Sequence, residues 1–114
     1  MESGVHVRSD KQEQVELGEI IEAVVNGMRP VAQCRYIRIS RCGLSSVAVL
    51  GNRARLIEAV GNLLHRAIRH CDSHTTLDCD LIERGRNAVV RVLDPGCLQR
   101  ANRGAVFELH VPRV

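Results

Sequence analysis

The stretch Glu58-Ala59-Val60-Gly61-Asn62-Leu63-Leu64-His65-Arg66-Ala67-Ile68-Arg69-His70 decides the fold of this chain. Its apolar residues recur every three or four positions, which is typical of one face of an amphipathic helix. Asn52 precedes it and can accept a hydrogen bond from the free amides of a first helical turn. We therefore predict a helix from about residue 53 to residue 70. Its core face is formed by Leu56, Val60, Leu63, Leu64 and Ala67.

A second amphipathic helix is predicted on the N-terminal side. From Val15 onward the apolar residues again step by three and four. Pro30 is expected to end or kink this helix near its C-terminus, because proline has no backbone N–H to donate. Residues 1–14 are polar, so we expect a tail or at most a short edge strand. The apolar stripe is formed by Leu17, Ile20, Ile21, Val24, Met28 and Val31.

The remaining segments are rich in β-forming residues, and several alternate apolar with polar positions. Residues 75–82 place Leu77, Cys79 and Leu81 on one side, and the turn at Arg84–Asn87 predicts a hairpin with the next strand. The predicted strands cover residues 36–40, 46–50, 75–82, 88–93 and 105–111, with a loop at 97–104. This order predicts an α+β fold, a two-layer α/β sandwich with two main helices on one face of a mixed sheet of about five strands.

Length and composition limit the possible functions. We expect a polar tail over residues 1–14 and a single domain over residues 15–114. The 16 basic residues are scattered among 13 acidic ones, and the chain has one Phe, one Tyr and no Trp, so neither a nucleic-acid groove nor function through aromatic stacking is expected. Five cysteines without CxxC spacing or a secretory segment indicate reduced thiols and a cytoplasmic protein. No apolar run is long enough for a membrane helix.

Several stretches, in chain order, resemble the catalytic ATP-binding domain of bacterial sensor histidine kinases, which belongs to the GHKL ATPase superfamily. The resemblance is to a degenerate, truncated form of that domain and runs from about Val15 to Arg113. Its strongest part looks like the N box, and Asp94-Pro95-Gly96 looks like the start of the first glycine box. The stretches are Val15–Ile21, Gly51–Leu56, Glu58–His70, Arg91–Gly96 and Gly104–Pro112.

This resemblance implies a residual nucleotide pocket formed by Glu58, Asn62, Arg66, Asp94 and Gly96. The first three share a helix face because they lie four residues apart. At the position of Arg66 the family has an asparagine that holds phosphate-bound magnesium, whereas a guanidinium cannot ligate a metal and repels it. Asp94 stands where the family accepts a hydrogen bond from adenine. We expect Mg²⁺ to be disfavoured and ATP or ADP to bind weakly at most.

The phosphate-binding part of such a pocket is reduced. Only five residues separate Leu98 from Gly104, where the family has its ATP lid, its second glycine box and a further helix. We therefore expect no catalytic residues, no cofactor and no ordinary kinase activity. Residual ATPase or phosphotransfer activity is a third reading, but it would require glycine loops like those of related kinases.

Histidines and cysteines gather between residues 65 and 79. Such side chains bind zinc, nickel or copper when they converge, although this spacing matches no standard zinc finger. His70, Cys71 and His74 are the best candidate trio, while Cys79 fits a buried free thiol. A Cys–His catalytic pair is less favoured, because no third orienting group is evident.

These features favour a pseudokinase-like domain that acts by protein–protein interaction in two-component-type signalling. Loss of the lid would uncover apolar surface, which favours binding of a histidine kinase, a response regulator or a second copy in a homodimer. The alternative is a small-ligand or metal sensor that uses the residual pocket or the His/Cys cluster.

Overall fold

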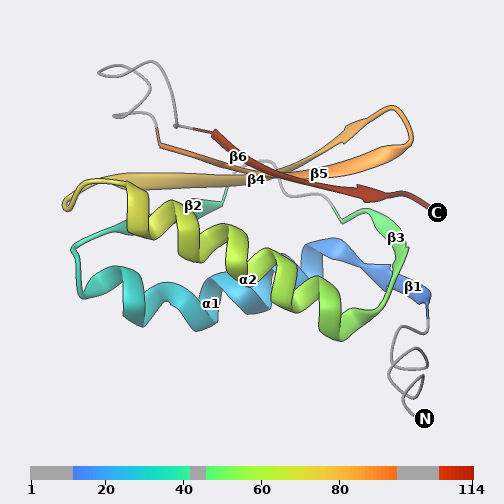
Figure 1. Ribbon diagram of the computed structural model, residues 1–114, viewed down its shortest axis with the longest axis horizontal. Helices are drawn as coiled ribbons and strands as arrows, with labels where there is room; N and C mark the ends of the chain where they lie inside the picture. Colours follow the sequence, from blue (N-terminus) through green and yellow to red (C-terminus); the bar gives the residue numbers. More distant parts are fainter. Residues whose placement is uncertain (1–11, 42–45, 95–105) are drawn as a thin grey trace, which may run out of the picture.

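The computed structural model describes residues 12–41, 46–94 and 106–114 of the chain. Two helices form one layer and a β-sheet forms the other, as Figure 1 shows. The predicted α+β sandwich, with both helices on one face of a mixed sheet, is confirmed. The predicted loop at 97–104 and most of the predicted tail lie outside the described residues. Neither helix is long and apolar enough to span a membrane.

Helix α2 covers Arg53–His70, as predicted. Asn52 is its N-cap, and the Asn52 Oδ1 accepts a hydrogen bond from the Arg55 amide at 3.0 Å. The other helix, α1, covers Leu17–Gln33. It continues beyond Pro30 for its last turn, where the Pro30 carbonyl accepts a bond from the Cys34 amide. Proline at this point removes one donor without ending the helix.

The larger sheet has four strands in the order β2-β4-β5-β6. The edge strand β2 is parallel to β4, and the other neighbours are antiparallel, so the sheet is mixed. β4 and β5 form the predicted hairpin, with Arg84 paired to Asn87. The bounds are Arg38–Arg41 for β2, Thr76–Arg84 for β4, Asn87–Leu93 for β5 and Val106–Pro112 for β6.

A second, two-stranded sheet was not predicted. It pairs β1, Glu13–Glu16, antiparallel with β3, Ala48–Gly51, so the first helix begins at Leu17 rather than at Val15. Val15 lies opposite Val49, and both are buried in the core. A four-residue strand with a single buried side chain carries too little alternation to be recognised in the sequence.

The hydrophobic core fills the space between helices and sheet. The predicted inward side chains Leu77, Cys79 and Leu81 of β4 are buried there, against the apolar faces of α1 and α2. Val90 and Val92 of β5 continue the same surface because they pair with Leu81 and Cys79. Burial of these faces fixes α2 on the sheet and leaves its opposite side exposed.

Replacing the cap residue should weaken α2 selectively. Asn52→Ala is expected to lower the free energy of unfolding by about 1 kcal/mol, because the first-turn amides lose an acceptor. Asn52→Ser, which keeps an acceptor, should stay within a few tenths of a kcal/mol of the wild type. Urea unfolding followed by circular dichroism measures both, and equal losses in the two variants would show that the cap is not the cause.

Candidate functional site

The outward face of α2 carries three of the five residues predicted to form the residual pocket. Glu58, Asn62 and Arg66 are all exposed and lie one turn apart, as their spacing predicted. None of their side chains has a hydrogen bond or ion pair with another residue of the described part of the chain. Their side chains are therefore available to a ligand or a partner, but nothing in the described structure orients them.

Asp94 lies at the end of β5 and is 3% exposed. Its Oδ1 accepts a hydrogen bond from the Thr75 hydroxyl at 3.3 Å. The Cys71 thiol is close enough for the carboxylate to affect it: burial first, and the negative charge of Asp94 second, raise the pKa of Cys71. Asp94 is thus a buried acceptor beside the C-terminus of α2.

The structure only partly brings the predicted pocket together. Asp94 is buried next to Cys71 and Thr75, at one end of α2, whereas Asn62 and Glu58 lie on the exposed side of the helix, further toward its N-terminus. Gly96 falls outside the described residues. Two cavities of the described structure, one between α1 and β2 and one beside Glu16 and Ser46, are lined by none of the predicted pocket residues.

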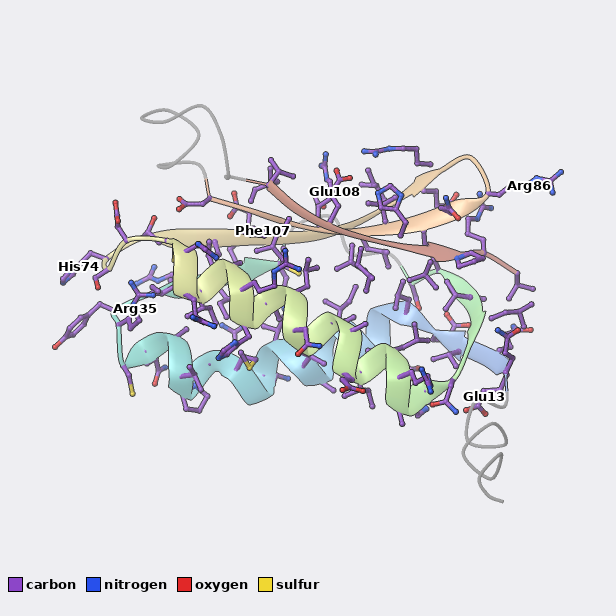
Figure 2. All side chains as sticks on the ribbon, in the orientation of Figure 1. Glu13, Arg35, His74, Arg86, Phe107 and Glu108 are labelled. Carbon is purple, nitrogen blue, oxygen red and sulfur yellow. The ribbon has the colours of Figure 1, made fainter. Side chains whose placement is uncertain are left out.

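Arg35 holds the C-terminus of α2 in place. Its Nη2 donates to the Cys71 carbonyl at 2.7 Å, and its Nη1 donates to the Ile68 carbonyl. The last carbonyls of a helix have no partner within the helix, and a cation there also interacts favourably with the helix dipole. Figure 2 shows Arg35 between the ends of the two helices, at the same end of the molecule as His74. Sequence reasoning missed this residue because more than 30 positions separate it from its acceptors.

The candidate metal trio does not converge. The His70 ring stacks on Phe107 of β6, with ring centroids 6.0 Å apart, and the His74 ring stacks on Tyr36. The Cys71 thiol is buried and donates to the Ile68 carbonyl at 3.5 Å. Among the described residues no three His, Cys, Asp or Glu side chains are grouped so that they could hold a metal ion.

A cavity of about 460 Å³ lies at an unexpected place, between the C-terminal half of α1 and the edge strand β2. Its lining residues are Arg29, Ala32, Gln33, Tyr36, Ile37, Arg38 and Ile39. Sequence reasoning missed it because the two segments become neighbours only when β2 joins the sheet. The one available signal was the run of basic and apolar residues around the end of α1.

The comparisons with solved structures agree with the fold. A mycobacterial sensor histidine kinase, MprB, superimposes with a TM-score of 0.65 at 20% identity, over 74% of this chain and 55% of that one. A histidine kinase from Burkholderia phymatum gives 0.67 at 22% identity, over 85% and 47%. The cytoplasmic segment of histidine kinase QseC gives 0.66 at 19% identity, over 91% and 78%.

These likenesses show that the chain has the fold of histidine kinase catalytic domains, as the sequence motifs predicted. The chain spans between 42 and 58% of the length of the first kinase structures that it matches. No known family profile and no curated protein sequence matches it.

Loss of the Arg35 contacts should destabilise the whole domain. Arg35→Met keeps an apolar stem but removes the guanidinium, so two half-buried carbonyls lose a charged donor, at a cost of about 2 kcal/mol. Arg86→Met is the matched control, because Arg86 is exposed on the β4–β5 hairpin at the other end of the molecule. Chemical unfolding of both variants tests this. Equal, small losses in the two would contradict a structural role for Arg35.

Proposed function

We propose that this chain is a histidine-kinase-type domain that has lost phosphotransfer and acts by binding a protein in two-component-type signalling. The observation that carries the proposal is Arg66 on the open face of α2. It takes the place of the asparagine that holds magnesium in the family that the sequence resembles, and no described carboxylate neutralises its charge.

Arg66 is incompatible with the chemistry that phosphoryl transfer requires. Magnesium neutralises the charge on the β- and γ-phosphates and needs oxygen ligands. A guanidinium remains protonated, offers only donors and repels the metal ion. Arg66 can still attract the phosphates themselves, so any nucleotide would bind without its metal and would not react.

The charge of α2 supports a protein partner with an acidic surface. The helix carries four arginines against one glutamate, and all five side chains are exposed. Such a face attracts an oppositely charged surface and accelerates encounter with it. The partner is a histidine kinase or a response regulator, or else a second copy of the chain in a homodimer, and the chain is cytoplasmic. The metal-sensor alternative has less support, because His70, Cys71 and His74 have separate partners.

The role of Arg66 can be tested by comparing ATP with and without magnesium. In the wild type, Mg²⁺ should weaken or abolish ATP binding, and no hydrolysis should be seen. Arg66→Asn should reverse the preference, so that Mg-ATP binds about tenfold more tightly than to the wild type, a gain of about 1.4 kcal/mol. Isothermal titration calorimetry measures both constants.

The control for this test is His65→Asn, a substitution at the neighbouring exposed position of α2 that leaves Arg66 in place. It should behave like the wild type. Tight Mg-ATP binding or ATP turnover by the unmodified chain would contradict the proposal.

Partner binding can be tested by reversing charge on α2. The chain is mixed with histidine kinases and response regulators from its source, and complexes are detected by chromatography with light scattering. Arg66→Glu combined with Arg69→Glu should abolish the complex or the homodimer, whereas Arg86→Glu with Arg84→Glu on the hairpin should not. A wild-type chain that remains a monomer in every mixture would count against the proposal.

A further inference from the structure

The cavity between α1 and β2 combines an apolar floor with basic walls. Ala32, Ile37 and Ile39 form the floor and are each at most 3% exposed. Arg29 and Arg38 are the two basic residues among the lining residues, and no acidic residue is among them. A concave apolar site of a few hundred Å³ with a small number of placed polar groups is the usual form of a small-molecule site.

The two cavity arginines have no carboxylate partner among the described residues, whereas four other arginines of the described structure do. Arg41, Arg84, Arg91 and Arg113 pair with Glu22, Glu108, Asp80 and Glu83. Arg29 instead contacts neutral groups: its Nη1 donates to the Ile39 carbonyl at 3.1 Å and its Nε to the Asn26 amide oxygen at 3.4 Å. Arg38 forms no ion pair with any described residue. The positive charge in the cavity is therefore not neutralised by the described protein.

The contacts of Arg29 favour a small ligand over a peptide strand as the occupant of the cavity. β2 is an edge strand, and an exposed edge can accept an added strand through its free backbone groups. Here the Ile39 carbonyl is occupied by Arg29, and the Ile37 amide donates to the Ala32 carbonyl. An added strand would have to displace these bonds, whereas a small anion would use the remaining donors of Arg29.

The rim of the cavity carries a fixed aromatic ring. Tyr36 is 70% exposed and stacks on His74, with ring centroids 4.8 Å apart and an interplanar angle of 5°. Both residues have positive φ, 59° for Tyr36 and 65° for His74, a conformation that costs energy for side chains of this size. His74 covers one face of the Tyr36 ring, and the exposure of Tyr36 leaves the other face open to a flat group.

We infer that this cavity binds a small organic anion that has an aromatic ring and a single carboxylate or phosphate group. The anion lies between Arg29 and Arg38, where two guanidinium groups can each donate to its oxygens. The ring lies over the apolar floor, against the open face of Tyr36. This site is separate from the α2 face and does not depend on the function proposed for it.

Titration of the isotopically labelled full chain with benzoate, phenyl phosphate and inorganic phosphate, followed by NMR, tests the inference. At least one ring-bearing anion should shift the amides of residues 29–39 saturably, with a Kd of about 1 mM or below. Inorganic phosphate should bind about tenfold more weakly, because it has no ring to bury. The tighter of benzoate and phenyl phosphate identifies the anionic group.

Single substitutions test whether the ligand-induced amide shifts arise from binding in the cavity. Arg38→Gln should weaken binding of the ring-bearing anion about tenfold, and Arg86→Gln, which removes the same charge from an exposed site on the hairpin, should leave it unchanged. Tyr36→Leu should weaken the ring-bearing anions but not inorganic phosphate. The absence of saturable shifts at residues 29–39, or an equal effect of Arg38→Gln and Arg86→Gln, would overturn the inference. Unchanged amide spectra of the free variants show that each is folded.

Discussion

The bonds from Arg35 to the carbonyls at the end of α2 constrain much of the structure. They fix the segment between α1 and β2 against the C-terminus of α2. On one side of this junction lie Cys71, Thr75 and the buried Asp94. On the other lie Tyr36 and His74, which stack at the rim of the α1–β2 cavity. One side chain therefore connects the region of the buried Asp94 with the rim of the α1–β2 cavity.

The sequence predicted the parts of this fold that carry a strong periodic signal. The apolar spacing of Leu56 to Ala67 and the cap at Asn52 gave α2 its observed bounds, and the alternation of Leu77, Cys79 and Leu81 gave β4 its buried face. Strand β1 was missed because it exists through its pairing with β3 rather than through its own pattern. The Arg35 contacts were missed because they join segments that are distant in the sequence. The cavity is lined by residues within 29–39, and it was missed because it forms only when β2 joins the sheet.

The two candidate sites differ in how firmly the protein holds their charged groups. On α2, Glu58, Asn62 and Arg66 project from an exposed helix face, where solvent screens their charges and nothing described orients them. In the cavity, Arg29 is half-buried and held by two hydrogen bonds. The exposed cationic face of α2 suits encounter with an acidic protein surface. The guanidinium of Arg29, which hydrogen bonds hold beside the apolar residues of the cavity, suits a small ligand.

The central claim is that the fold of a histidine kinase catalytic domain is retained here while the metal-dependent nucleotide chemistry is lost. Paramagnetic line broadening by Mn²⁺ in the presence of ATP tests it most directly, because manganese replaces magnesium and broadens the NMR signals of nearby amides. The account predicts no selective broadening around Asn62 and Arg66. Broadening confined to that part of α2, and relieved by excess Mg²⁺, would contradict it.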